Sequence, residues 1–211
     1  MSADKTLTWS YTEEFPFEDE VTAQARLRGI ELGTSPVSPA TGAALRALAA
    51  AAGAKSVAEI GTGTGVSGLW IMAGMGADGV LTTIDVEAEF QREARRAFDA
   101  AGYSGHRTRI IQGRASDVMP RMAAGSYDMV VLDVDPQDAA DLLQDALRML
   151  RAGGSLVITH ALWRDHVADP ARRDAVTVAA RELGKTLRDA DGLLTSLLPV
   201  GDGLLVAVRR S

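Results

Sequence analysis

Short apolar runs alternate with amphipathic segments from about residue 39 to the C-terminus. The apolar runs predict buried strands, and the segments between them repeat apolar residues at helical spacing. Strands are expected at residues 56–60, 79–84, 107–112, 127–132 and 155–159. Helices are expected at residues 39–53, 66–75, 87–101, 116–122, 137–150 and from Asp169-Pro170 to about 184. Nearly continuous apolar strands separated by helices predict an α/β fold whose parallel sheet is covered on both faces.

The C-terminal segment departs from this alternation. Residues 193–200 and 204–209 resemble strands, and only Gly201-Asp202-Gly203 lies between them. Three residues cannot form the crossover that parallel strands need, so the pair is expected to be an antiparallel hairpin. The sequence therefore predicts one domain, 1–211, with a seven-stranded, mostly parallel sheet. Residues 36–211 form its core, and residues 1–35 an extension with an amphipathic helix at 18–32.

Composition restricts the classes of function. The net charge of −6 argues against a general affinity for nucleic acid. The absence of cysteine excludes disulfides, a thiol nucleophile and cysteine-ligated zinc. The sequence contains no run of about 18 apolar residues, so no membrane span is expected, and the N-terminal residues lack the pattern of a signal peptide. We therefore expect a cytoplasmic protein with no nucleic-acid or membrane partner.

A glycine-rich stretch, VAEIGTGTGVSG at 57–68, joins the first strand to the next helix. Doubly wound folds bind nucleotides at this position. Asp85 ends the second strand, 20 residues after Gly65, where an acid can accept hydrogen bonds from the ribose hydroxyls of an adenosine. Glu59 precedes the loop, and a buried carboxylate there would need donors or a cation. The pattern therefore predicts a ligand that carries adenosine.

Two cofactor classes fit this pattern, because a dinucleotide and S-adenosylmethionine both contain a ribose. Glu59 is poorly suited to an anionic pyrophosphate and better suited to a positively charged sulfonium amino acid. The nucleotide-binding pattern also fills nearly the whole chain, which leaves little room for the second catalytic region of a dehydrogenase. These points favour a methyltransferase that uses S-adenosylmethionine, with an NAD-dependent oxidoreductase as the less favoured alternative.

The sequence resembles the catechol and caffeoyl-CoA O-methyltransferase family, in particular its actinobacterial members. The resemblance covers about residues 30–210 and rests on these segments: VAEIGTGTGVSGLW, DGVLTTIDVE, RTRIIQGRASDVM, SYDMVVLDVDP and LRAGGSLVI. It implies a Rossmann-like class I methyltransferase fold, S-adenosylmethionine as cofactor and O-methylation of a small-molecule acceptor. In this family an N-terminal helix covers the acceptor site or joins a homodimer.

The resemblance also implies roles for individual residues. Those expected to bind the cofactor are Val37, Glu59, Gly61, Thr62, Gly63, Gly65, Ser67, Asp85, Val86, Ala115, Asp133 and Asp135. Asp133 and Asp135 would face the reacting centre, and Trp163 could form a wall of the acceptor pocket beside Asp133.

The sequence departs from the family at the catalytic positions. Metal-dependent members use an Asp after the fourth strand and an Asp-Asn pair after the fifth. This chain keeps Asp133 but has Thr159-His160 at the pair, and Pro136 replaces the family lysine. A divalent metal is therefore doubtful, although a site formed by Asp133, His160 and waters stays open. Asp133, Asp135 and His160 are the candidate bases. A histidine that only caps the strand end, and a catalytically silent cofactor-binding module, are the alternatives.

Overall fold

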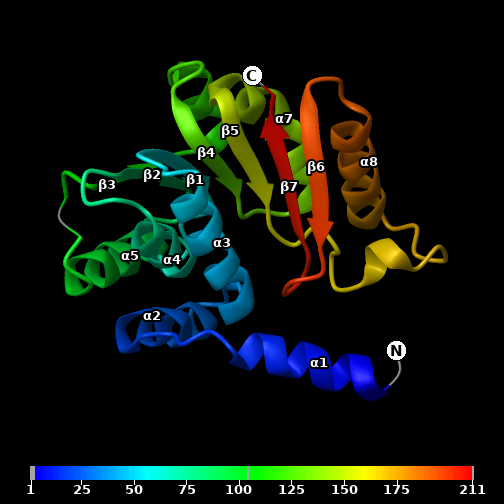
Figure 1. Ribbon diagram of the computed structural model, residues 1–211. Helices are drawn as coiled ribbons and strands as arrows, with labels where there is room; N and C mark the ends of the chain where they lie inside the picture. Colours follow the sequence, from blue (N-terminus) through cyan, green and yellow to red (C-terminus); the bar gives the residue numbers. More distant parts are fainter. Residues whose placement is uncertain (1–2, 104, 211) are drawn as a thin grey trace.

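The computed structural model describes residues 3–103 and 105–210. Its centre is a seven-stranded sheet with the strand order β3-β2-β1-β4-β5-β7-β6 (Figure 1). Strands β1 to β5 pair in parallel, and β7 pairs antiparallel with both β5 and β6. The strands are β1 (Ser56–Ile60), β2 (Val80–Asp85), β3 (Thr108–Gln112), β4 (Tyr127–Leu132), β5 (Leu150–Ile158), β6 (Leu193–Leu198) and β7 (Leu204–Arg209). The predicted fold class, including the terminal hairpin, is confirmed.

Helices cover both faces of the sheet, because alternate strand residues point to opposite sides. On one face Val57 of β1 and Val131 of β4 pack with α2 (Glu20–Glu31), α3 (Pro39–Ala51), α4 (Val66–Gly74) and α5 (Ala88–Ala100). On the other face Ala58 and Val130 pack with α7 (Pro136–Met149), α8 (Ala175–Asp189) and the short α6 (Ala115–Val118), which continues as a 3-10 turn, Met119–Arg121. Loops that bind ligands can therefore gather at the carboxyl ends of the parallel strands.

The prediction that a helix begins at Asp169-Pro170 is wrong, because α8 (Ala175–Asp189) starts later in the chain. Asp169 instead accepts the N–H of Ala171 at 2.9 Å, which forms a local turn after the 3-10 segment His166–Ala168. Helix α8 begins after Asp174, whose side chain accepts the N–H of Thr177 at 2.9 Å. Asp174 and not Asp169 is therefore the N-cap of this helix.

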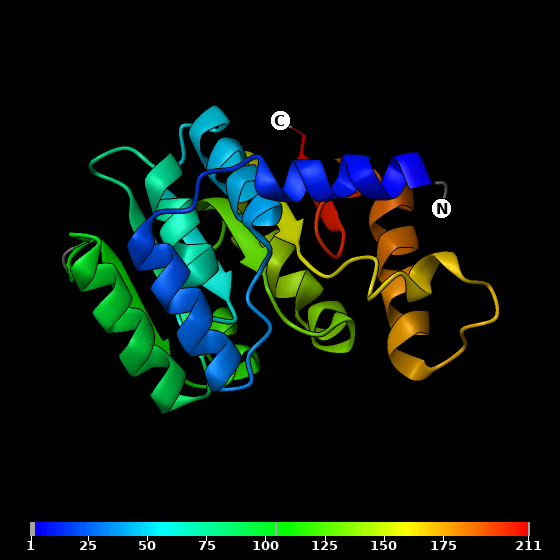
Figure 2. The ribbon, with the colours of Figure 1, turned by 90° about the horizontal axis from the view of Figure 1, so that it is seen from below.

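The N-terminal residues form two helices. α2 matches the predicted helix and starts after Asp19, which accepts the N–H of Thr22 at 3.0 Å. α1 (Ala3–Glu14) was not predicted. It lies across the end of the β6–β7 hairpin and also contacts α3 (Figures 1 and 2). None of the described helices is long and apolar enough to cross a membrane.

Candidate functional site

The glycine loop between β1 and α4 depends on backbone conformations that favour glycine. The φ angles of Gly61, Gly63 and Gly65 are +96°, +49° and +92°. A Cβ atom at Gly61 would overlap the backbone carbonyl oxygen of Asp133. Glycine is therefore required at 61 both for its conformation and for the close approach of the β1 and β4 ends.

Glu59 lies beneath this loop, fully buried. Its Oε2 accepts the hydroxyl hydrogen of Thr83 at 2.6 Å, whereas its Oε1 has no hydrogen-bond partner among the residues that the structure describes. Burial raises the pKa of Glu59 to about 8, although the nearby hydroxyl groups of Ser67 and Thr83 oppose the shift. A buried carboxylate with one unused oxygen can be stabilised by a cationic ligand or by further donors.

Asp85, at the end of β2, holds the loop from the other side. Its Oδ2 accepts the N–H of Gly63 at 2.9 Å, and its Oδ1 accepts the N–H of Glu87 at 3.0 Å. Asp85, which the sequence predicts to bind the ribose, therefore also fixes the shape of the glycine loop, because its carboxylate anchors the backbone at Gly63. Each carboxylate oxygen can accept more than one hydrogen bond, so a ribose can still bind.

Two neighbouring cavities at the strand ends contain most of the predicted cofactor residues. The larger has a volume of about 570 Å³ and is lined by Gly61, Asp85, Val86, Ala115 and Asp133, among others. The second has a volume of about 260 Å³. It shares Gly61, Asp85 and Asp133 with the first and adds these predicted residues: Val37, Thr62, Gly63, Ser67, Asp135 and His160. Glu59 lies below the loop, and Gly65 caps α4. The two cavities adjoin each other at Gly61, Asp85 and Asp133. We refer to them together as the adenosyl site, because the sequence predicts cofactor binding there.

A third cavity, of about 390 Å³, lies on the other side of the segment that contains Val37. Its lining comes from four parts of the chain: α1, residues 36–41, residues 159–165 and the β6–β7 turn. Pro36, Val37 and His160 line both this cavity and the second one. We call it the acceptor cavity, because it adjoins the end of the adenosyl site at which Asp133 and His160 lie.

Asp133 and His160 meet at this boundary. Oδ1 of Asp133 accepts the hydroxyl hydrogen of Thr159 at 2.5 Å and lies 3.4 Å from Nε2 of His160. Nδ1 of His160 lies 3.1 Å from Oδ2 of Asp202, in the turn between β6 and β7. Burial lowers the pKa of His160, but the hydrogen bonds and charges of Asp133 and Asp202 outweigh this and raise the pKa to about 10. His160 is therefore a cation at neutral pH, which argues against a base role in the free protein.

Three residues of the acceptor cavity, Trp9, Arg164 and Asp202, were not predicted from the sequence, and one predicted residue, Trp163, lies outside the cavities. Trp163 is not among the described residues that line the three cavities; its ring instead lies 5.4 Å from the guanidinium carbon of Arg164. Arg164 and Trp9 line the acceptor cavity. Asp202, between two glycines in a hairpin turn, gave no signal beyond that turn. Within residues 3–103 and 105–210 no group of three or more His, Cys, Asp or Glu side chains could hold a metal ion.

Comparison with known proteins agrees with this geometry. A family model described as O-methyltransferase matches residues 10–210. The "Probable O-methyltransferase Rv1220c" of Mycobacterium tuberculosis is 47% identical over 201 residues, which cover 95% of this chain and 90% of that protein.

The chain belongs to the O-methyltransferase family. The family predicted from the sequence, with its actinobacterial relatives, is therefore confirmed. Two solved structures extend the likeness. A Corynebacterium glutamicum protein aligns with a TM-score of 0.90 and 36% identity, over 100% of this chain and 98% of that one. The O-methyltransferase TomG of Streptomyces achromogenes, solved in complex with S-adenosylmethionine, aligns with a TM-score of 0.86 and 25% identity over the whole of both chains.

Proposed function

We propose that this O-methyltransferase transfers the methyl group of S-adenosylmethionine to a hydroxyl of a small molecule bound in the acceptor cavity. One observation carries the proposal. Glu59, buried beneath the glycine loop with Oε1 unpaired, adjoins a site that runs from Asp85 to Asp133 and His160 and there meets a separate cavity. In the free protein burial keeps a proton on Glu59 at neutral pH, since its pKa is about 8. A cationic sulfonium nearby would favour the ionised form, whereas an anionic pyrophosphate would oppose it.

The residues around the adenosyl site fit this cofactor in chemical type. Asp85 can accept from the ribose hydroxyls, Val86 and Ala115 can contact the adenine, and Ser67 can donate to the carboxylate of the methionine part. When bound, S-adenosylmethionine supplies a methyl group whose bond to sulfur breaks, with its electron pair left on sulfur, as the bond to the acceptor oxygen forms. The protein has to bind the acceptor in line with that bond and exclude water.

We propose that Asp133 takes the acceptor proton. Asp133 lines the two adenosyl cavities, and both of its described side-chain contacts use Oδ1. Its Oδ2 can therefore accept a proton from a hydroxyl that extends from the acceptor cavity past His160. Transfer of the hydroxyl proton to Asp133 as the oxygen–carbon bond forms raises the electron density on the attacking oxygen. Asp135 lines the cofactor side of the boundary and begins α7, which makes it a less direct candidate.

Family membership supports S-adenosylmethionine-dependent O-methylation. Neither the oxidoreductase nor the silent binding module receives support from the similar proteins. Calorimetric titration with S-adenosylmethionine and with NAD tests the cofactor, and a panel of phenols, catechols and amines with labelled cofactor tests transfer. Binding of NAD but not of S-adenosylmethionine would contradict the proposal. Cofactor binding without transfer to any acceptor would favour the silent module.

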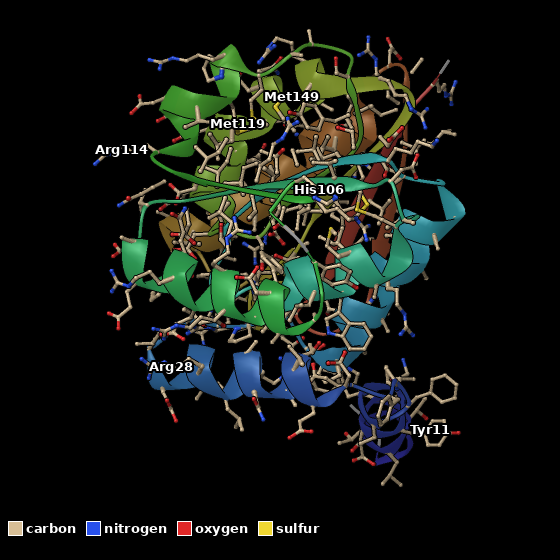
Figure 3. The ribbon with its side chains drawn as sticks, turned by 90° about the vertical axis from the view of Figure 1, so that its left-hand side faces the viewer. Tyr11, Arg28, His106, Arg114, Met119 and Met149 are labelled. Atoms are coloured by element: carbon tan, nitrogen blue, oxygen red, sulfur yellow. The ribbon has the colours of Figure 1, made fainter. Side chains whose placement is uncertain are left out.

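We also propose that the protein forms a homodimer through the outer face of α1. Leu7 and Tyr11 are exposed on α1, at 70% and 67%, and Phe15 and Phe17 are exposed in the segment that follows it, at 76% and 84%. Figure 3 shows Tyr11 pointing away from the rest of the molecule. An exposed aromatic face of this kind is typical of an interaction surface. Light scattering of the protein and of Tyr11→Ser checks it, since the substitution is expected to shift a dimer toward monomer. The cytoplasmic location remains a prediction.

A further inference from the structure

The β6–β7 turn holds the segment 160–165 at several points. The backbone carbonyl of Asp202 accepts the N–H of Leu162 at 2.8 Å, and that of Gly203 accepts the N–H of Ala161 at 3.1 Å. Oδ1 of Asp202 accepts the N–H of Arg164 at 2.5 Å, and Oδ2 contacts His160. Asp202 therefore binds both the backbone and the histidine side chain of this segment.

The same segment has an unusual backbone. His160, Trp163, Arg164 and Asp165 have φ angles of +54°, +44°, +55° and +63°. Side-chain-bearing residues rarely adopt this region, and they persist there when surrounding contacts determine the conformation. The β6–β7 turn lies close enough to this segment to determine its conformation, since a Cβ atom at Gly203 would lie 2.5 Å from Cγ of Leu162. The contacts of Asp202 and Gly203 account for a conformation that the segment would not favour alone.

His160 lies between two carboxylates that hold it unequally. Nδ1 is 3.1 Å from Asp202, on the side of the hairpin, and Nε2 is 3.4 Å from Asp133, where the adenosyl site meets the acceptor cavity. About four fifths of the imidazole is buried, with a side-chain exposure of 21%. The longer contact lies on the side toward Asp133, so a hydroxyl can enter there without disturbing the contact with Asp202.

We propose that Asp202 is a positioning residue, which fixes His160 so that Nε2 and Asp133 together bind the acceptor hydroxyl. This inference rests on the proposed methyl transfer. The hydroxyl oxygen accepts a hydrogen bond from Nε2–H, and its own hydrogen points to Oδ2 of Asp133. As the oxygen–carbon bond forms, the hydroxyl proton passes to Asp133, and His160 keeps both of its protons. A fixed cation beside the oxygen stabilises the negative charge that develops as the proton leaves.

The charges around His160 are consistent with this role. Asp133 and Asp202 face the ring, Asp135 lies on the cofactor side, and Glu13, Arg164 and Asp165 line the acceptor cavity. Glu13 is occupied by backbone donors, namely Gly201 at 3.0 Å and Ala40 at 3.3 Å. Two carboxylates therefore act on the ring directly, and they keep it charged at neutral pH against the effect of burial.

The first test measures His160 without turnover. The chain has 3 histidines, so NMR signals of the imidazoles can be assigned with His-to-Gln variants. In the wild type His160 is expected to stay protonated through pH 8. Asp202→Asn keeps the backbone carbonyl and a side-chain oxygen that can accept the N–H of Arg164, but it removes the negative charge. The titration midpoint of His160 is therefore expected to fall by at least about one pH unit. Asp191→Asn, in the exposed turn before β6, is the matched control and should leave it unchanged.

The second test uses catechol as the acceptor and calorimetry with S-adenosylmethionine. Asp202→Asn is expected to lower kcat about tenfold or more and to change the cofactor Kd less than twofold, with partial recovery in Asp202→Glu. His160→Gln should show the same separation of effects. Activity is measured with EDTA and with Mg²⁺, and a strict need for Mg²⁺ would overturn the role of His160 as the cation.

Two further results would overturn the inference: an ordinary midpoint near 6.5 for His160 in the wild type, or unchanged titration and kcat in Asp202→Asn. If catechol is not methylated, the histidine titration decides alone. A wild type that does not bind S-adenosylmethionine contradicts the proposed function itself. A wild type that binds it and transfers methyl, with Asp202→Asn unaffected, contradicts only the role of Asp202.

Discussion

The backbone N–H of Gly63 donates to Oδ2 of Asp85 at 2.9 Å, which connects the glycine loop after β1 to the end of β2. Asp85→Ala should therefore weaken S-adenosylmethionine binding in two ways, through the lost ribose acceptor and through a less fixed loop. We expect a loss of roughly 1–3 kcal/mol, measured by calorimetry. Asp117→Ala, on the exposed side of α6, serves as the control. A change in Kd below twofold for Asp85→Ala would contradict both roles.

Gly61 and Asp133 give a prediction about stability. Gly61→Ala places a methyl group against the carbonyl oxygen of Asp133 at a φ of +96°. Gly102→Ala is the matched control, since Gly102 has a φ of +79° but no described atom within 4 Å of the added Cβ. We expect about 1 kcal/mol of destabilisation at Gly102 and on the order of 3 kcal/mol or more at Gly61. Urea denaturation measures both, and equal losses would mean that the overlap with Asp133 relaxes without cost.

Local pattern accounts for the parts of the fold that the sequence predicts. Strands such as Tyr127–Leu132 are short buried apolar runs, and the loop of Gly61, Gly63 and Gly65 can be recognised because its glycines stand close together directly after such a run. The same holds for the terminal hairpin, because a three-residue connection permits only antiparallel pairing. Asp85 and Asp133 could be found in the same way, because each stands at the end of such a strand.

The missed features depend on contacts between distant residues. His160 and Asp202 are 42 positions apart, and Glu13 and Gly201 are 188 apart, so no spacing rule connects them. α1 escaped prediction because Leu7 and Tyr11 are exposed, which means that the helix lacks the buried apolar stripe on which helix prediction depends. The acceptor cavity is formed by these contacts, which explains why the cofactor residues were easier to predict than the acceptor residues.

Glu59 predicts a pH dependence of stability. Its folded pKa is about 8, above the ordinary value of 4.5, so between these values the folded state holds a proton that the unfolded state has released. The contribution of this group to stability is therefore fully present below about pH 4.5 and is lost as the pH rises through 8. Glu59→Gln removes this loss, which is on the order of a few kcal/mol.

Chemical denaturation between pH 5 and 9 measures the effect. The difference in unfolding free energy between Glu59→Gln and the wild type should move in favour of the variant as the pH rises. Parallel curves over the whole range would show that Glu59 titrates normally. His160 acts in the same direction, since its raised pKa gives stability that is present below about 6.5 and is lost as the pH approaches 10. The comparison at constant His160 therefore isolates Glu59.

Glu13 anchors α1 across the acceptor cavity. Its carboxylate accepts the N–H of Gly201 at 3.0 Å and that of Ala40 at 3.3 Å, which connects the N-terminal helix to the hairpin turn and to the start of α3. Trp9, on the same helix, lines the cavity. Glu13→Ala should therefore loosen α1 without touching the adenosyl site.

We expect the acceptor KM of Glu13→Ala to rise roughly three- to tenfold, which corresponds to the loss of one typical hydrogen bond. The Kd of S-adenosylmethionine should stay unchanged. Hydrogen exchange should become faster in α1 and remain the same in β1 and β4, because only the attachment of the helix is lost. Glu14→Ala, which removes a neighbouring but exposed carboxylate, is the control. An increase in KM equal to that of Glu14→Ala would mean that α1 does not shape the acceptor cavity, and a parallel loss of cofactor binding would mean that Glu13 acts on the glycine loop instead.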